Sequence, residues 1–333
     1  MKKNKFYFIF LIALALIALT LYLTRRSGTI PQELKDFAIE DTASVSQIFM
    51  AGKSGQSIHL LRKESHWEVN GKYHARKDAV DVLLKTLLRM DVKSPVPQAS
   101  FETVVTNLAA EHTKVEVYTS GNEPEKVFYV GGATADNYGT YMMLEKSSTP
   151  FIMHIPGFAG YLSTRFFLDE NDWRDVGLFR YRFDEIKSVT LENIRQPEQS
   201  FTAINRGNNQ FDLVYASSNQ PYQGFDTLKV KEYLSAFKKL NFERFVDELT
   251  ETQIDSVFQL SPEYIIRLED TYGKTTQLKA TLRKAELDDD YYQYDVDRMY
   301  GRINENDELV IIQYFNFDPL FRDIDDFRLT PAS

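Results

Sequence analysis

Residues 67–90 read WEVNGKYHARKDAVDVLLKTLLRM and join a predicted β-hairpin directly to a predicted helix. Asn70-Gly71 is the strongest short hairpin signal, because both residues accept the positive φ angles of a tight turn. From Asp78 to Met90, apolar side chains recur at i, i+3, i+4 and i+7, a spacing that places them on one face of a helix. This face consists of Val80, Leu83, Leu84 and Leu87. The stretch therefore predicts a hairpin followed by a half-buried helix.

The same helical spacing returns 150 residues later, in the segment 228–245. Its apolar positions are Val230, Tyr233, Leu234 and Phe237. The next predicted helix keeps the offset, because Val104 and Leu108 are matched by Ile254 and Phe258. Ser100 is a predicted N-cap in the first copy, and Thr250-x-x-Gln253 is a capping box in the second. A constant offset across two helices predicts an internal duplication.

Strand-like runs surround each helix pair in the same order. In the first copy they cover residues 44–51, 57–62, 67–73, 114–119, 126–130, 141–144 and 151–155. In the second copy they cover residues 186–192, 200–205, 210–215, 264–270, 275–283, 297–303 and 308–315. Helices grouped between strands favour an α+β fold with mainly antiparallel sheets over a doubly wound parallel sheet. We expect two tandem repeats, 35–172 and 173–333, each with about three strands, two helices and four strands; chance agreement between two α+β segments is the alternative.

The segment 6–23, FYFIFLIALALIALTLYL, contains no charged residue. A helix of this length spans about 27 Å, close to the hydrocarbon thickness of a bilayer. We expect an uncleaved transmembrane anchor, represented by Phe6, Leu11, Leu14, Leu16, Leu19 and Leu23. A cleaved signal peptide is the alternative, although residues 21–26 lack the small side chains of a cleavage site. A lipoprotein signal is excluded because the chain contains no Cys.

Positive charge sets the expected orientation of this anchor. Three Lys residues precede it and two Arg residues follow it, and the more positive side stays in the cytoplasm. The expected arrangement is a cytoplasmic tail and anchor in residues 1–26, a linker in 27–34 and a periplasmic body at the bacterial inner membrane. The reverse orientation stays open, because Arg25 and Arg26 favour it.

The body that follows the anchor is acidic. Five of the 39 Lys and Arg residues lie in residues 1–26, so 34 basic residues remain against 48 acidic ones, a net charge of −14. This balance excludes nucleic acid as a partner, because nucleic-acid binding needs a basic face. The absence of Cys removes disulfides, thiol nucleophiles and the usual structural zinc sites.

These residues resemble a bacterial family known as domain of unknown function 4340. The resemblance rests on the hairpin and helix in residues 67–87, on the opening run SVSQI at residues 44–48, and on the single anchor behind a basic N-terminus. It covers about residues 35–330 in outline. The family has no assigned catalytic residues, so none can be transferred. The resemblance implies a membrane-tethered accessory protein, often associated with ABC-transporter-like components, including gliding-motility-type exporters.

The most unusual segment for chemistry is the acidic, tyrosine-rich run 287–297. We interpret it as a candidate partner-binding surface, because acids and tyrosines make adaptable contacts; its residues are Asp288, Asp289, Asp290, Tyr291, Tyr292 and Tyr294. A solvated loop between two strands is the alternative. The glycine-rich segment 131–139 reads as a hairpin turn, because it lacks the phosphate-loop pattern.

His66 and His74 flank the Asn-Gly hairpin and could share a metal with Glu64 or Asp78, but metal-ligand spacing is absent and exposed loop histidines are the plainer interpretation. The sequence contains no recognised nucleophile motif. We therefore predict no catalytic residues, no metal and no cofactor.

The sequence favours a non-enzymatic, extracytoplasmic accessory or scaffold protein that binds a membrane complex, such as an ABC-transporter-like or gliding-motility-type system. A module that binds envelope glycans or peptidoglycan is the alternative, in which Trp67 and Trp173 could stack on sugars. A carboxylate-dependent hydrolase is the third and least favoured interpretation.

Overall fold

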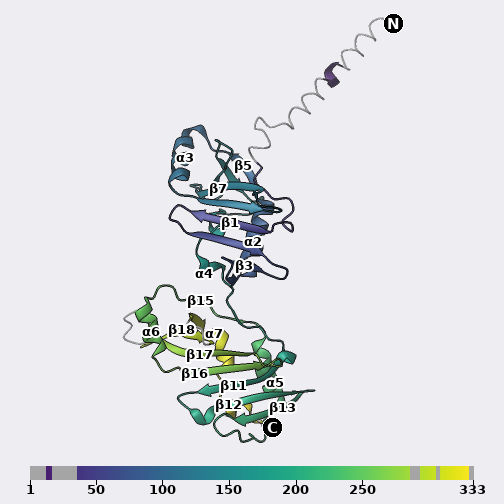
Figure 1. Ribbon diagram of the computed structural model, residues 1–333, viewed down its shortest axis with the longest axis vertical. Coiled ribbons are helices and arrows are strands. Elements are labelled where there is room, and N and C mark those ends of the chain that lie inside the picture. The colour runs from purple at the N-terminus through teal and green to yellow at the C-terminus, as the bar shows by residue number, and fades with distance from the viewer. Residues whose placement is uncertain (1–12, 17–35, 286–292, 305–307, 330–333) are drawn as a thin grey trace, which may run out of the picture. The chain divides into compact units, whose positions relative to one another are not determined.

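The computed structural model describes residues 13–16, 36–285, 293–304 and 308–329 (Figure 1). Contacts between Cα atoms divide the chain into two compact units, Met1–Asp175 (unit 1) and Val176–Ser333 (unit 2). Each unit combines an antiparallel sheet with a few helices, so the expected α+β class with mainly antiparallel sheets is confirmed.

Unit 1 contains one antiparallel sheet. In the order in which they lie side by side, its strands are β4 (Tyr73–His74), β3 (Trp67–Val69), β2 (Ser57–Arg62), β1 (Gln47–Gly52), β6 (Thr113–Tyr118), β7 (Lys126–Ala133), β8 (Thr140–Leu144), β9 (Phe151–His154) and β5 (Asp91–Pro95). The run 67–73 divides into β3 and β4 at the Asn-Gly turn. Asn70 and Gly71 have φ angles of 54° and 65°, and the N–H of Lys72 donates to the Val69 carbonyl at 3.2 Å. The local turn chemistry therefore forms the hairpin that the sequence predicts.

Two helices cover opposite faces of the unit 1 sheet. Helix α2 (Lys77–Arg89) buries one stripe of side chains in the main core, namely Val80, Leu83, Thr86 and Leu87. Leu84, expected on this face, is only partly buried. Helix α3 (Phe101–Ala110) packs Val104 and Leu108 against the other face. Ser100 does not cap α3 with its side chain, because its hydroxyl donates to the Pro97 carbonyl instead.

Unit 2 contains a second antiparallel sheet. Its strands, again in spatial order, are β13 (Gln210–Tyr215), β12 (Phe201–Gly207), β11 (Ile186–Asn193), β16 (Tyr264–Asp270), β17 (Thr275–Lys284), β18 (Tyr294–Ile303), β19 (Leu309–Gln313) and β15 (Arg244–Phe245). A separate ribbon pairs β10 (Gly177–Phe179) with β14 (Leu240–Asn241). The spatial order of strands in this sheet follows that of unit 1 from β3 to β5.

The helix expected over residues 228–245 is shorter than the sequence suggested. Helix α5 spans Thr227–Ser235, and a 3-10 turn, η6 (Ala236–Lys238), follows it. Beyond this turn the backbone is extended, because the N–H of Glu243 donates to the Ile311 carbonyl at the edge of the sheet. Phe242 and Phe245 are buried there, so packing at the sheet edge replaces the last two turns of the expected helix.

The second helix of unit 2 begins as predicted. Helix α6 (Glu251–Phe258) starts at a capping box, in which the Thr250 N–H donates to Gln253 Oε1 at 2.9 Å. Ile254 and Phe258 are partly buried, so α6 covers the sheet less completely than α3 does in unit 1. The contrast leaves a small cavity of about 190 Å³ beside α6, where the guanidinium of Arg302 lies 4.2 Å from the ring centroid of Phe258.

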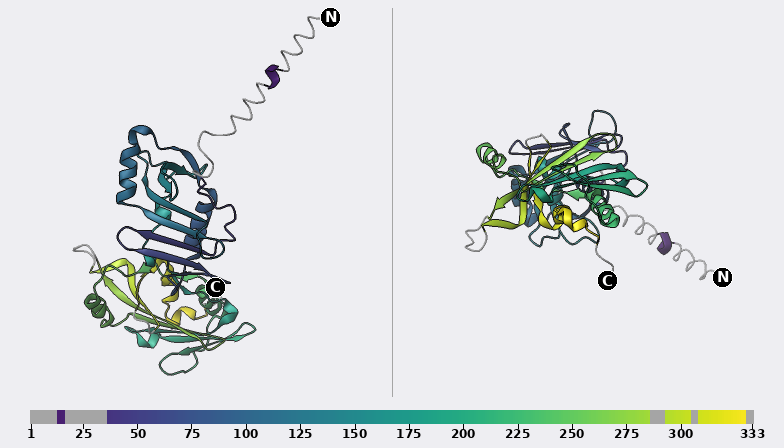
Figure 2. Two further views of the ribbon diagram at one scale, coloured as in Figure 1. Left: turned by 45° about the horizontal axis from the view of Figure 1, so that its top comes forward. Right: turned by 90° about the horizontal axis from the view of Figure 1, so that it is seen from below.

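The chain ends in an aromatic segment that completes the core of unit 2. It contains α7 (Tyr314–Phe317) and the 3-10 turns η7 (Asp318–Leu320) and η8 (Ile324–Phe327). This segment, drawn in yellow, lies on the same side of the sheet as α5 (Figure 2). Its buried side chains join those of α5 in one core, and they are Phe317, Leu320, Ile324 and Phe327.

Most of the expected anchor lies outside the described residues. Residues 13–16 form a helical turn in which Leu14 and Leu16 are exposed, whereas the structure does not describe Phe6, Leu11, Leu19 or Leu23. In the described part of the chain, no helix has both the length and the apolar character to cross a membrane.

Candidate binding pocket

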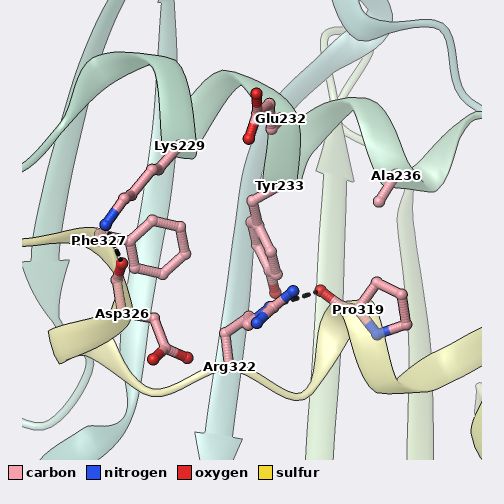
Figure 3. A pocket seen from close by; sticks show the side chains of 8 residues that line it. All are labelled: Lys229, Glu232, Tyr233, Ala236, Pro319, Arg322, Asp326 and Phe327. Atoms are coloured by element: carbon pink, nitrogen blue, oxygen red, sulfur yellow. Dashed lines mark hydrogen bonds between the residues drawn. The ribbon is translucent and has the colours of Figure 1, made fainter.

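A pocket opens in unit 2 between α5 and the C-terminal segment (Figure 3). Its volume is about 450 Å³, within the usual range for small-molecule sites. Helix α5 and the residue after it supply half of the lining, and the C-terminal segment supplies the rest; the eight residues are Lys229, Glu232, Tyr233, Ala236, Pro319, Arg322, Asp326 and Phe327. The pocket therefore lies over the same core that holds α5 on the sheet.

Tyr233 carries a buried hydroxyl at this pocket. The side chain descends from α5 with its hydroxyl beside the guanidinium of Arg322 (Figure 3). The residue is only 5% exposed, and its O–H has no hydrogen-bond partner among the described residues. Burial raises the pKa of the Tyr233 hydroxyl far above its usual value, so the group is a neutral donor at physiological pH. Buried polar groups normally have a partner, so this orphan hydroxyl needs an explanation.

The charged residues of the pocket do not pair with one another. Lys229 Nζ donates to the carbonyls of Asp326 and Arg328, both at 3.0 Å, and Arg322 Nε donates to the Pro319 carbonyl at 3.3 Å. Within the part of the chain that the structure describes, no ion pair joins these two cations to Glu232 or Asp326. The pocket thus presents both signs of charge, and the orphan Tyr233 hydroxyl is buried in its wall.

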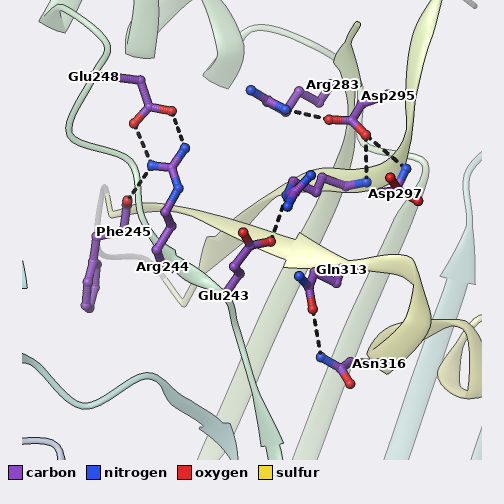
Figure 4. A network of polar contacts seen from close by, with 10 residues as sticks. Glu243, Arg244, Phe245, Glu248, Arg283, Asp295, Asp297, Gln313 and Asn316 are labelled. Atoms are coloured by element: carbon purple, nitrogen blue, oxygen red, sulfur yellow. Dashed lines mark hydrogen bonds and ion pairs between the residues drawn. The ribbon is translucent and has the colours of Figure 1, made fainter. Parts of the chain in front are cut away.

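A network of polar contacts lies at the start of β18, around Asp295 (Figure 4). Arg283 and Asp295 form a buried ion pair at 2.5 Å, with side chains 8% and 13% exposed. Asp295 also accepts hydrogen bonds from the N–H groups of Asp297 and Arg298, at 2.9 and 3.0 Å. Arg298 in turn pairs with Glu243 at 2.8 Å, so this network joins β18 to the residue before β15.

Most of the predicted partner-binding residues lie outside the residues that the structure describes. The structure does not describe Asp288, Asp289, Asp290, Tyr291 or Tyr292, whereas Tyr294 opens β18 and is exposed. Two apolar neighbours extend this exposed surface: Val296 is 57% exposed and Phe315 of α7 is 89% exposed. The pairing of Arg298 with Gln313 brings this end of β18 next to α7.

The histidine pair comes together without a metal-binding arrangement. The rings of His66 and His74 stack with their centroids 4.0 Å apart, and His66 Nε2 lies 3.6 Å from Glu68 Oε1. Asp78, one of the two possible further ligands considered from the sequence, forms an ion pair with Arg76. Among the described residues, no group of three His, Asp or Glu side chains has the geometry to hold a metal ion.

Neither tryptophan forms an open platform for a sugar. Trp173 is fully buried, stacks on Phe167 and donates its indole N–H to the Phe167 carbonyl at 2.9 Å. Trp67 is partly buried and lies under the guanidinium of Arg62. The glycine-rich segment 131–139 ends β7 and turns into β8, with Asn137 at a φ angle of 59°.

Residues 67–257, more than half of the chain, match the model of a family described as domain of unknown function (DUF4340). The chain belongs to the DUF4340 family. The match begins at Trp67, the first residue of the hairpin discussed above, and ends within α6. No curated protein and no solved structure matches the chain.

Sequence patterns in this DUF4340 protein did not single out the pocket. In the sequence, Tyr233 belongs to the apolar stripe of a predicted helix, which indicates a core position. Arg322 lies in the aromatic C-terminal segment and is part of no recognised motif. One signal was present: the buried stripe carries a tyrosine where its counterpart 150 residues earlier, Leu83, is aliphatic.

Proposed function

We propose that this DUF4340 protein is a membrane-tethered binding protein of the bacterial inner membrane, with its body in the periplasm and a membrane complex as its partner. The uncharged segment 6–23 supports the tether, and the three Lys residues before it favour a cytoplasmic N-terminus. Tethering confines the body near the membrane and so raises its effective concentration toward membrane partners.

The proposal includes a duplication of one α+β domain. From β3 to β5 and from β13 to β15, the two sheets have the same order of strands. Helix α2 follows β4 in unit 1, and α5 follows β13 in unit 2. Two buried side chains of α2, Val80 and Leu83, lie 150 residues before two buried side chains of α5, Val230 and Tyr233. The second copy differs at the surface, since it carries the open pocket and the acidic segment.

We place partner docking at the start of β18. The observation that carries this choice is the exposed cluster of Tyr294, Val296 and Phe315. In the sequence, three acidic residues, 288–290, come shortly before Tyr294. Exposed aromatic and apolar side chains next to charges of one sign are typical of a protein interface. The acidic residues call for a partner with a basic surface, and an ABC-transporter-like component is the partner that the family resemblance implies.

Docking through side chains suits these sheets better than strand addition. The edge at β4 is occupied by the chain itself, because the Asp175 N–H donates to the His74 carbonyl at 2.8 Å. At β13 the Tyr222 N–H donates to the Leu213 carbonyl at 2.8 Å. β5 ends in Pro95, which has no N–H to offer to an added strand.

Carboxyl groups with a displaced pKa in the described residues serve as hydrogen-bond and ion-pair partners rather than as general acids. A glycosidase-type general acid needs a carboxyl group with a raised pKa. The carboxyl groups whose pKa is displaced are all shifted downward by hydrogen bonds and charges from their neighbours, and they are Asp78, Glu116, Asp136, Asp184, Glu248 and Asp325. Such groups stay ionised and act as ion-pair partners.

The tether predicts where the full-length protein resides. We expect it in the membrane fraction after an alkaline wash, because an apolar helix resists extraction that removes peripheral proteins. In cells whose outer membrane has been opened, added protease should digest the body while cytoplasmic markers survive. A protected body would show the reverse orientation, and release by the alkaline wash would contradict the tether.

The docking surface predicts a loss of partner affinity in a triple variant. Replacing Tyr291, Tyr292 and Tyr294 with alanine should weaken co-purification of the membrane partner by about 10-fold or more, because aromatic anchors dominate interface energies. The matched control is Tyr272→Ala in the turn between β16 and β17, which removes a tyrosine that is even more exposed. Equal loss in both variants would contradict the assignment of this surface.

A further inference from the structure

In unit 1, an arginine bridges helix α2 and the segment that follows β9. Arg165, in the 3-10 turn η3 (Ser163–Arg165), donates from Nη1 to Thr86 Oγ1 of α2 at 2.8 Å. Its guanidinium also lies 4.4 Å from the ring centroid of Phe158. The helix presents fully buried Leu83 one turn earlier, so it leaves no orphan polar group beside the arginine.

Unit 2 changes both helix positions. At the 150-residue offset, Thr86 is replaced by Ala236 and Leu83 by Tyr233. Alanine has no hydroxyl that could accept a hydrogen bond from Arg322 of the C-terminal segment. Arg322 donates to the Pro319 carbonyl through Nε alone. The result is the 450 Å³ pocket, with the Tyr233 hydroxyl and the free end of the guanidinium on one side.

The differences between Leu83 and Tyr233 and between Thr86 and Ala236 are typical of a binding site and not of a packed core. A buried hydroxyl without an acceptor destabilises the fold, whereas the leucine of unit 1 avoids this cost. The hydroxyl and the guanidinium are both donors, and together they favour an oxyanion, above all a planar carboxylate that matches the arginine fork. Glu232, which forms no ion pair in the described chain, offers a negative charge at the same pocket.

We propose that this pocket binds a small zwitterion, a free amino acid or a short peptide with free ends. Its carboxylate would accept from the Tyr233 hydroxyl and from Arg322, and its ammonium group would face Glu232. The proposal holds for unit 2 whether or not the start of β18 docks a membrane complex, because the two sites share no residue.

The test is calorimetric titration of the full-length protein in detergent with three probes. They are the dipeptide alanyl-alanine, its N-acetyl form and its C-terminal amide. We expect the dipeptide to bind, the N-acetyl form to bind more weakly and the amide to lose binding, because a charged hydrogen-bond acceptor contributes more than a neutral one. Absence of heat from all three up to about 10 mM, or equal binding of dipeptide and amide, would overturn the proposal.

Tyr233→Phe separates binding from stability. We expect it to weaken dipeptide binding by about 10-fold or more, while raising the Tm of unit 2 by about 2–4 °C as the orphan hydroxyl is removed. The matched control is Tyr222→Phe, because the buried Tyr222 hydroxyl does have a partner, Asp325 Oδ1 at 2.8 Å.

Tyr222→Phe should lower the Tm and leave dipeptide binding unchanged, since Tyr222 does not line the pocket. Unchanged dipeptide affinity in Tyr233→Phe would contradict the proposed role of the hydroxyl. A lower Tm in that variant would show that the hydroxyl has a partner in the folded protein, which would equally remove the basis of the proposal.

Discussion

Replacement of Leu234 with alanine is expected to destabilise unit 2 by about 2–5 kcal/mol and to leave unit 1 unchanged. Leu234 is fully buried on the inner face of α5, within the core that also holds the C-terminal segment. Its truncation removes apolar contacts and leaves a cavity that a packed core fills only in part. The matched variant is Leu83→Ala on α2, which should have an effect of similar size confined to unit 1.

The distribution of tryptophan makes this prediction easy to read. Trp67 and Trp173, the two tryptophans of the chain, both belong to unit 1, so their fluorescence follows the unfolding of that unit alone. Circular dichroism follows both units. In urea unfolding, Leu83→Ala should lower the midpoint of the transition followed by tryptophan fluorescence. Leu234→Ala should leave that midpoint unchanged and lower only the midpoint of the unit 2 transition in circular dichroism. A shift of the fluorescence midpoint in Leu234→Ala would show that the two units unfold together. A loss of only a few tenths of a kcal/mol in the free energy of unfolding, in either variant, would contradict the assignment of the buried helix faces.

Removal of the Asp295 carboxylate is expected to cost about 3–5 kcal/mol. Asp295→Ala removes the carboxylate that pairs with the buried guanidinium of Arg283, and breaking a buried ion pair is costly. It also leaves the N–H groups of Asp297 and Arg298 without their acceptor at the start of β18. Because this network supports the proposed docking surface, partner affinity should fall together with stability.

The exposed pair of Arg244 and Glu248 is the control for Asp295→Ala. Hydrogen bonds from Arg244 lower the pKa of Glu248 to about 2, but the two side chains remain 44% and 41% exposed. Glu248→Gln should therefore cost less than about 1 kcal/mol at neutral pH. Its contribution is present above the unfolded pKa of 4.5 and is lost as the pH falls toward 2. Urea unfolding of both variants at pH 7 measures the contrast, and equal costs would show that the Arg283 pair is not effectively desolvated.

Local patterns were enough for most of the strands and for the start of the four helices that the sequence predicts, whereas α7 forms where a strand was expected to continue to residue 315. The Asn70-Gly71 turn and the Thr250-x-x-Gln253 cap form as predicted, because short-range steric and hydrogen-bond preferences decide both. The run 264–270 coincides with β16, because period-2 alternation reports a half-buried strand directly.

Features that depend on distant partners were not predicted. β5 and β15 are short strands next to helices, and only their pairing with β9 and β19 makes them extended. The helix expected over 228–245 ends early for the same reason. Phe242 and Phe245 bury their rings at the edge of the sheet, and this burial favours extended backbone over a longer helix. The pocket depends on how α5 meets a segment some ninety residues later, and no periodicity in the sequence reports that approach.

The most direct test of the docking proposal is site-specific photo-crosslinking in intact cells. A photoreactive residue would replace Phe315 of α7, next to the start of β18, and in a matched strain it would replace Tyr272; both positions are exposed by about nine-tenths. We expect the probe at Phe315 to crosslink an integral membrane protein, and the probe at Tyr272 to crosslink none. An equal pattern from both positions, or no membrane-protein adduct from Phe315, would contradict the proposal that this end of unit 2 docks a membrane complex.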